Sequence, residues 1–351
     1  MNAPPPAIPL IDVRDGGPPR HAQERAAQAR SLRDCCLRFF PRAAAPLIPA
    51  LDRLSRRALR RSRSPYVGEI AQIAAALDFS GVWLLNASYQ WGCTGRADEQ
   101  NGVPWLLRTL DWPFHGLGRY TELAHLRGEA GDFVSVTWPG YVGVLTAMAP
   151  GRFAAALNQA PMWRYTRNRW LRPFDYAVNA LAAAASTGRM PPDQLLRRAF
   201  EISGDFAAAR RLLETVPVAR PVIYTLAGCA ARERCVIERT ETDFVTRVDD
   251  TCAANDWVPS RPGWEGRIGT RRFFSEVVRR RRWLQPGAAR RIEGLERFAF
   301  SEPVRLAARA GAQSLYPGCG RHESGGWESA RRRLRHDRRR TARTGDANPR
   351  A

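Results

Sequence analysis

One of the seven cysteines is followed, a short way along the chain, by an arginine and an aspartate that could activate its thiol. Cys93 lies in the run Trp91–Gly95, and Arg108 and Asp111 lie in the run Leu107–Trp112. A hairpin formed by the two runs would bring the Arg–Asp pair back beside the cysteine. A neighbouring guanidinium lowers the pKa of a thiol below its free value of about 8.5, which favours the nucleophilic thiolate. The aspartate could hold the arginine, or an amine, in one orientation, so the pattern predicts a thiol nucleophile with an orienting group.

The base that this chemistry requires is not an evident histidine. The chain has five histidines, and none stands in a recognisable Cys–His signature. If the chain were cut between Gly92 and Cys93, the new α-amino group, with a pKa of about 7.7, could act as the base. Cleavage would then supply the nucleophile and the base in one residue.

Helices are expected to precede the hairpin. Residues 21–64 carry apolar residues at helical spacing, interrupted by prolines, which predicts two or three short helices. A further helix is expected over residues 65–77. The continuous apolar run Val82–Tyr89 has the length of a strand and predicts one that is buried on both faces and leads into the cysteine. The polar stretch Arg96–Gly102 is expected to reverse the chain.

Beyond the hairpin, strand-like and helical stretches follow one another. The strand-like segments are Val103–Leu110, Phe133–Trp138, Val142–Met148, Phe153–Asn158, Val222–Ala227, Cys235–Arg239 and Phe244–Val248. Residues 173–216 have helical texture, with helices expected at Leu195–Ile202 and Asp205–Leu213. The order of sheet, helices and sheet predicts an α+β protein built of packed layers, not a doubly wound parallel sheet.

The composition is strongly basic, and its 55 basic residues, all of them arginine, outnumber 34 acidic residues to give a net charge of +21. Arginine runs lie at residues 56–63, 279–282 and 331–340. This charge raises the alternative of a nucleic-acid-binding protein. The sequence carries no recognition-helix motif, zinc spacing or aromatic ribonucleoprotein signature, and the complete absence of lysine indicates a codon bias. Nucleic acid is therefore the weaker hypothesis for a partner.

Compartment and cofactors are predicted from what the sequence lacks. Residues 1–20 are proline-rich and do not show the basic-then-apolar pattern of a secretory signal. No window approaches eighteen uncharged apolar residues, so no transmembrane span is expected. The cysteines have no metal-ligand spacing. A cytoplasmic protein with reduced thiols, and with no metal and no cofactor, is expected.

The motif around the cysteine carries a resemblance to a known group of enzymes. Ser88–Thr94 together with Arg108–Asp111 resembles the N-terminal-nucleophile Cys hydrolases, which include acid ceramidase, N-acylethanolamine acid amidase, choloylglycine hydrolase and the penicillin acyltransferases. Further segments resemble the group in the same order: Pro139–Thr146, Pro150–Phe153, Leu157–Gln159, Leu195–Leu213, Pro221–Gly228, Val236–Arg239 and Ala253–Trp257. The similarity spans roughly residues 64–272.

The resemblance implies a four-layer αββα sandwich, with two antiparallel sheets between helix layers, preceded by an N-terminal helical segment. It divides the chain into an Arg-rich helical segment at 1–63, a hydrolase domain at 64–300 and an Arg-rich tail at 301–351. Family members return with sheet strands near the C-terminus, whereas residues 301–351 do not read as strands. A disordered or frameshifted tail is therefore expected.

The resemblance also implies a role for each matched residue. Cys93 would be the nucleophile after autocatalytic cleavage of the Gly92–Cys93 bond. Arg108 and Asp111 would position the amino group and the substrate carbonyl. Asn255 would donate its side-chain amide to the oxyanion, a role worth about 10²–10³ in rate when one donor is removed.

Two further residues would bind the substrate. Asn158 would line the pocket, and a late arginine, either Arg267 or Arg271, would follow the Asn motif. The activity implied is that of an autoprocessed amidohydrolase or acyltransferase, which acts on a linear N-acyl amide or acylated amine through an acyl-thioester on Cys93. A homo-oligomer is compatible with the sequence. An inactive, unprocessed relative is the remaining alternative.

Overall fold

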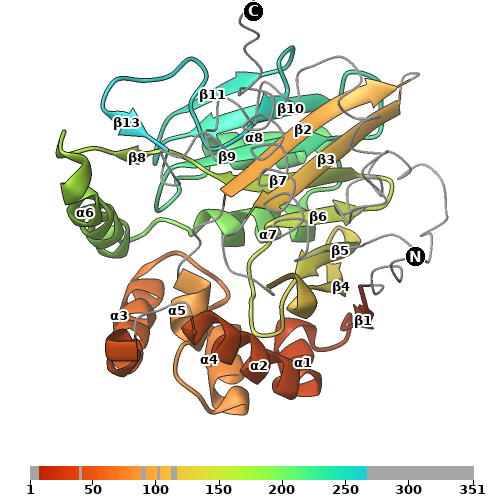
Figure 1. Ribbon diagram of the computed structural model, residues 1–351. Coiled ribbons are helices and arrows are strands. Elements are labelled where there is room, and N and C mark those ends of the chain that lie inside the picture. Colours follow the sequence, from red (N-terminus) through yellow and green to blue (C-terminus); the bar gives the residue numbers. More distant parts are fainter. Residues whose placement is uncertain (1–7, 39–41, 88–91, 101–102, 112–116, 267–351) are drawn as a thin grey trace, which may run out of the picture.

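The computed structural model describes residues 8–38, 42–87, 92–100, 103–111 and 117–266, which form two stacked sheets with helices on one side (Figure 1). The large sheet has eight strands, in the order β1 (Leu10–Asp12), β4 (Glu122–Gly128), β5 (Gly131–Thr137), β6 (Thr146–Ala149), β7 (Phe153–Gln159), β9 (Val222–Ala227), β10 (Arg234–Arg239) and β11 (Phe244–Arg247). Only the β1–β4 pair within it is parallel.

The small sheet is a hairpin with a short third strand. Its order is β12 (Cys252–Ala253), β2 (Gly92–Gln100) and β3 (Val103–Asp111), all antiparallel. The hairpin packs over β7, β9 and β10 of the large sheet. A third pair, β8 (Met162–Trp163) with β13 (Trp264–Glu265), lies beside both sheets.

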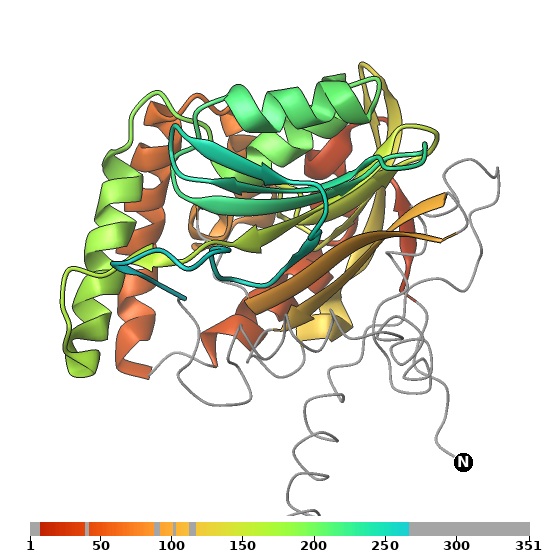
Figure 2. The ribbon, with the colours of Figure 1, turned by 90° about the horizontal axis from the view of Figure 1, so that it is seen from above.

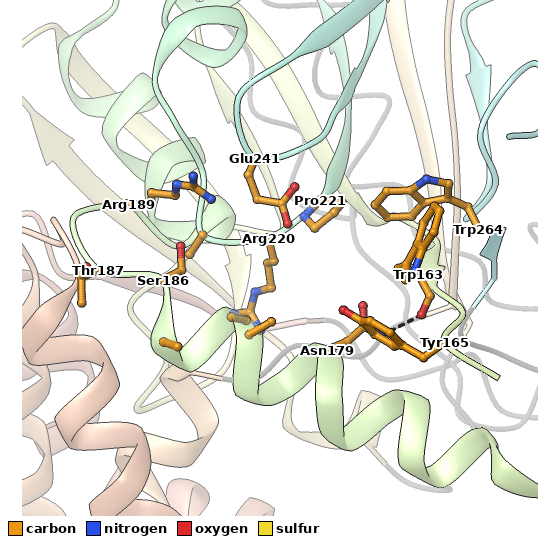
Figure 3. A pocket seen from close by; sticks show the side chains of 14 residues that line it. Trp163, Tyr165, Asn179, Ser186, Thr187, Arg189, Arg220, Pro221, Glu241 and Trp264 are labelled. Atoms are coloured by element: carbon orange, nitrogen blue, oxygen red, sulfur yellow. Dashed lines mark hydrogen bonds between the residues drawn. The ribbon is translucent and has the colours of Figure 1, made fainter. Parts of the chain in front are cut away.

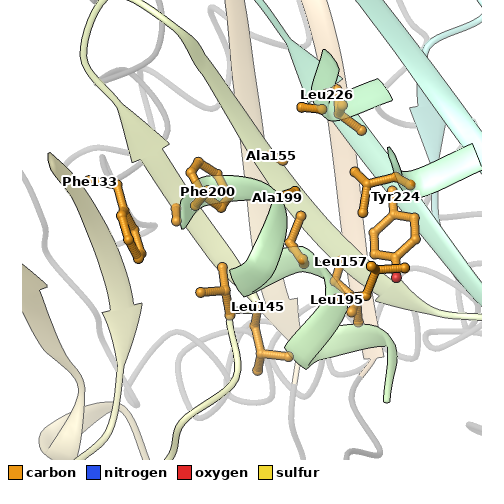
Figure 4. Close-up of a cluster of buried hydrophobic side chains, with 14 of the residues drawn as sticks. Phe133, Leu145, Ala155, Leu157, Leu195, Ala199, Phe200, Tyr224 and Leu226 are labelled. Atoms are coloured by element: carbon orange, nitrogen blue, oxygen red, sulfur yellow. The ribbon is translucent and has the colours of Figure 1, made fainter. Parts of the chain in front are cut away.

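Two helices, α7 (Pro192–Ile202) and α8 (Phe206–Thr215), cover the face of the large sheet opposite the hairpin (Figure 2). In α7 the buried apolar residues recur at helical spacing, and Phe200 stacks on Phe133 and Phe153 with ring centroids 5.5 and 4.6 Å apart (Figure 4). Helix, large sheet and hairpin sheet account for three of the four layers expected. The α+β sandwich is confirmed.

The two sheets meet across a core of small side chains. Ala97 and Leu106 of the hairpin pack against Met148, Ala154, Ala156 and Ala227 of the large sheet. Because alanine side chains are short, the hairpin can lie close to the central strands. All residues of β7 and β9 are buried, which explains why these strands read as continuous apolar runs.

The N-terminal helices pack at one end of the large sheet (Figure 1). They are α1 (Gly17–Glu24), α2 (Ala26–Leu37), α3 (Ile48–Arg61), α4 (Val67–Leu77) and α5 (Val82–Ala87), with the 3₁₀ turn η1 at Arg42–Leu47. The remaining turns and helix are η2 (Leu117–Tyr120), η3 (Arg169–Leu171) and α6 (Arg172–Ala185). None of the helices in the described part of the chain is both long and apolar enough to cross a bilayer.

A buried ion cluster joins the first helix to the large sheet. The fully buried Glu122 of β4 contacts His21 Nε2 and accepts a hydrogen bond from Arg25 Nε, each at 2.7 Å. Burial raises the pKa of Glu122, but the histidine and arginine contacts outweigh it and leave the pKa below its ordinary value. The cluster therefore stabilises the attachment of α1 when the carboxylate is ionised.

The predicted strand at Val82–Tyr89 is wrong, because residues 82–87 form helix α5. A short apolar run does not distinguish a buried strand from a buried helix by periodicity. The buried residues are Val82, Trp83 and Asn86, which is helical spacing, and Asn86 donates to the carbonyls of Val82 and Gly140. Residues 88–91 lie outside the described part of the chain.

Two further boundaries differ from the expectation. The strand predicted at Val142–Met148 begins only at Thr146, because the amide of Val142 is bound by the Asn86 side chain and that of Val144 by the carbonyl of Asp193. The turn expected at Arg96–Gly102 is shorter, since β2 continues to Gln100. Strand β4 was not predicted. The boundary at residue 63 remains a prediction, and the tail at 301–351 lies outside the described residues.

Candidate active site

The hairpin places the predicted cysteine and arginine side by side. In the β2–β3 register Cys93 lies opposite Leu110 and Gly95 opposite Arg108. Arg108 Nη2 donates to Cys93 Sγ at 3.0 Å. Both side chains are buried, with no exposed surface on Cys93 and 5% exposure on Arg108. The structure therefore brings a guanidinium into direct contact with a thiol that is shielded from solvent.

The same guanidinium is anchored to the large sheet. Arg108 Nη2 also donates to the carbonyl of Leu157 on β7 at 2.7 Å, and Nη1 donates to Thr146 Oγ1 on β6 at 2.5 Å. The planar fork of an arginine can make such divergent bonds without losing its orientation. Thr146 was not foreseen as part of this site, because its approach to Arg108 depends on how the two sheets stack.

Asn255 holds the backbone of the cysteine. Its Oδ1 accepts a hydrogen bond from the Cys93 N–H at 2.8 Å, and its Nδ2 donates to the carbonyl of Gln159 at 2.7 Å. These partners, a donor on one side and a carbonyl on the other, fix which amide atom faces the cysteine. Strand β12 pairs Ala253 with Gly95, which carries the Asn segment to this position.

The geometry adds to the role that the family resemblance implies for Asn255. In the uncut chain its carbonyl oxygen faces the nitrogen that cleavage would turn into the α-amino group. Its amide nitrogen donates to the carbonyl of Gln159. The side chain therefore holds the Cys93 nitrogen with one end and the large sheet with the other.

Asn158 is fully buried behind the Asn255 segment. Its Nδ2 donates to the carbonyls of Ala253 and Ala254 at 3.1 and 2.9 Å, which ties β7 to that segment. Its Oδ1 has no hydrogen-bond partner among the described residues. The structure thus shows Asn158 as a support for Asn255.

Gly95 is required by a close contact between the sheets. A Cβ placed on it would lie 3.0 Å from Thr225 Oγ1 and 3.7 Å from Asn158 Nδ2. Such a contact is tighter than ordinary van der Waals packing, so a larger residue would lift the hairpin from β9. The glycine two positions after the cysteine therefore sets the distance between the thiol and the large sheet.

The remaining predicted residues are placed only in part. Asp111 ends β3, where its backbone lies opposite Gly92, one residue from the cysteine. Arg267 and Arg271 lie outside the described residues.

Two other buried cysteines have a different environment. Burial raises the pKa of Cys235 and of Cys252 to about 12, against opposing arginine charges. These thiols stay protonated at neutral pH, and buried thiols of this kind are inert. Their role is packing.

Comparison with curated proteins confirms the resemblance to the N-terminal-nucleophile Cys hydrolases, although no model of a known protein family matches the chain. The relatives are N-acylethanolamine-hydrolyzing acid amidases. The Rattus norvegicus protein is 29% identical over 183 residues, which is 50% of this chain and 47% of the rat protein. The Mus musculus protein is 27% identical over 183 residues, with the same coverage, and the Cavia porcellus protein is 28% identical over 182 residues, 50% of this chain and 48% of that protein. The chain spans about half the length of these relatives.

A solved structure also aligns with the chain. It is the Caenorhabditis elegans N-acylethanolamine-hydrolyzing acid amidase ortholog, at 20% identity, covering 44% of this chain and 63% of that chain. The TM-score of this alignment is 0.36.

Proposed function

We propose that the protein is a Cys amidohydrolase that acts on a linear N-acyl amide, with Cys93 as the nucleophile after cleavage of the Gly92–Cys93 bond. One observation carries the proposal. Arg108 contacts the sulfur of Cys93 while Asn255 holds the nitrogen of the same residue. If one residue supplies both the nucleophile and the base, its thiol and its nitrogen must both be held in place, and these two contacts hold them.

Cleavage would begin with attack of the Cys93 sulfur on the carbonyl carbon of Gly92. The C–N bond breaks, the nitrogen takes up a proton to become an α-amino group, and a thioester joins the two fragments. Water then hydrolyses the thioester, which frees the thiol and the carboxylate of Gly92. Arg108 favours the attacking thiolate, and a hydrogen bond to a charged group is worth about 1.5–3 kcal/mol.

Turnover would repeat this chemistry on a substrate. The thiolate attacks the carbonyl carbon of the amide, and the α-amino group passes a proton to the leaving amine. Asn255 donates to the oxygen on which charge develops. The acyl-thioester is then resolved by water, in a hydrolase, or by a second amine, in an acyltransferase. Asp111 and a late arginine, Arg267 or Arg271, keep the positioning roles that the resemblance implies.

The similarity to N-acylethanolamine-hydrolyzing acid amidases supports an N-acylethanolamine as the first substrate to test. The high basic charge gives only weak support to the alternative of nucleic-acid binding, because several arginines stabilise the fold itself. Arg152, Arg197 and Arg239 are buried and donate to carbonyls or carboxylates of the protein.

The test compares Cys93→Ala with the wild type and with Cys252→Ala, a matched change at a buried cysteine on the neighbouring strand. Wild type and Cys252→Ala should yield fragments of 92 and 259 residues and hydrolyse an N-acylethanolamine. Cys93→Ala should do neither. Because the chain has no lysine, cleavage raises the number of reactive amines from one to two α-amino groups, so labelling of the 259-residue fragment with an amine-reactive dye reports processing. Processing or hydrolysis by Cys93→Ala would overturn the proposal.

A further inference from the structure

A pocket of about 430 Å³ lies between α6 and the turn that enters β9, and the β8–β13 pair closes one side (Figure 3). Its volume suits a small molecule. Arg189 and Ser186 lie at one end, Trp163 and Trp264 at the other, and Glu241 and Arg220 lie between them. The pocket therefore has an aromatic end and a charged end.

The aromatic end adjoins the Asn255 segment. The rings of Trp163 and Trp264 meet edge to face with centroids 5.6 Å apart, and Trp264 makes the same contact with Trp257 at 5.6 Å. Trp257 follows Asn255 by two residues. Because Trp163 keeps 41% of its surface exposed, this apolar wall is open to solvent. An apolar chain could lie along it.

Charged and polar side chains line the other end of the pocket. Ser186 Oγ is buried without a hydrogen-bond partner among the described residues. In the same residues neither Arg189 nor Glu241 forms a side-chain ion pair. Arg220 donates to the last carbonyl of α5 at 2.8 Å, and its charge acts on the buried Asp193, whose pKa burial nevertheless raises. The lining of this end carries two guanidinium groups, one carboxylate and the Ser186 hydroxyl.

The charged end lies within reach of a substrate bound at the thiol. Val222 pairs with Gln159, whose carbonyl binds Asn255, and Arg220 comes two residues before Val222. Two residues of extended chain and one strand spacing together span roughly 10 Å from Gln159 to Arg220, and the Asn255 side chain bridges Gln159 and Cys93. A substrate of moderate length can therefore place its amide at Cys93 and a polar group in the pocket.

We propose that this pocket selects amide substrates that carry a carboxylate away from the scissile bond. The proposal rests on the proposed function. The apolar part of the substrate lies against the indoles of Trp163 and Trp264, and its carboxylate pairs with Arg189 and Arg220. The carboxylate can stand on the amine part of the substrate or at the far end of its acyl chain, and both sources present the same chemistry to the arginines.

Binding is measured by titration calorimetry on the wild-type protein after processing, with Cys93 alkylated by iodoacetamide so that the probes are not turned over. The probes are N-dodecanoylethanolamine, N-dodecanoylglutamate and N-(11-carboxyundecanoyl)ethanolamine. At least one of the two carboxylate probes should bind roughly tenfold or more tightly than the neutral amide, since an arginine–carboxylate contact is a charge-assisted hydrogen bond. The probe that gains affinity identifies which end of the substrate enters the pocket.

Single variants of the processed protein, alkylated in the same way, locate the effect. Arg189→Gln should remove most of the preference for the carboxylate, and Glu241→Gln should increase it. Arg211→Gln, a matched change at an exposed arginine of α8, should leave all three affinities within about twofold. Equal binding of the neutral and anionic probes, or an unchanged preference in Arg189→Gln, would overturn the proposal.

Failure of the subsite and failure of the enzyme are separable. If wild type hydrolyses the neutral amide but the binding experiment shows no carboxylate preference, the carboxylate subsite is refuted and the proposed amidase function is supported. If wild type hydrolyses none of the probes while the Arg189-dependent preference is present, the subsite is supported and the proposed function falls.

Discussion

Replacement of Asn255 by alanine should lower both the free energy of unfolding and the rate of amide hydrolysis. The side chain is 2% exposed and bridges the Cys93 N–H and the Gln159 carbonyl. Each buried hydrogen bond that loses its partner costs about 1–3 kcal/mol, so the loss of two should lower the free energy of unfolding by about 2–6 kcal/mol. That is a large part of the total of about 5–15 kcal/mol of an ordinary domain. The loss of an oxyanion donor should in addition lower the hydrolysis rate by about 10²–10³.

The control for Asn255→Ala is Asn86→Ala, another buried asparagine with three backbone hydrogen bonds. Urea unfolding should show a comparable loss of stability in both variants. Amide hydrolysis and cleavage of the Gly92–Cys93 bond, expressed per folded molecule, should fall only in Asn255→Ala. An Asn255→Ala protein that cleaves and hydrolyses within about threefold of wild type would refute the assignment.

Three further outcomes are expected. Arg108→Gln should slow alkylation of Cys93 by iodoacetamide in the processed protein roughly tenfold to a hundredfold at pH 7, because the guanidinium no longer stabilises the thiolate; an unchanged rate would mean that the contact does not activate the thiol. Burial raises the pKa of Cys235 and Cys252 to about 12, so peptide mapping of native protein alkylated at pH 8 should find both unmodified until urea is added. The pKa of Glu122 is lowered in the folded protein, so its contribution to stability is complete above about pH 4.5 and is lost as the pH falls through the folded pKa. In Glu122→Gln the free energy of unfolding should therefore depend less on pH below about 4.5. An equally steep dependence in wild type and variant would contradict this expectation.

Part of the candidate site could be predicted because its residues are close to one another in the sequence. Cys93 and Arg108 lie on adjoining strands, and a hairpin brings such residues together whatever the rest of the fold does. The helices at α7 and α8 and the strands β9, β10 and β11 also match their predicted segments closely. These elements are long or carry clear turn signals.

The rest depends on packing between distant segments. Thr146 meets Arg108 only because the two sheets stack in one register. The pocket takes Arg189 from the loop before α7 and Glu241 from the turn after β10, which no sequence spacing connects. Helix α5 has five apolar residues and one asparagine, a length and composition that suit a strand or a helix equally, and the contacts of Asn86 with the neighbouring loop favour the helix.

The contact between the thiol and the guanidinium lies within the hairpin, because Cys93 and Arg108 both belong to it. The same guanidinium is also bound by Thr146 and Leu157 of the large sheet. Its orientation toward the sulfur therefore depends on how the two sheets pack. Four alanines, a leucine and Met148 form the core between the sheets. Oxidation of Met148 would place a polar oxygen between the layers, and we expect it to slow alkylation of Cys93 in a protein that remains folded.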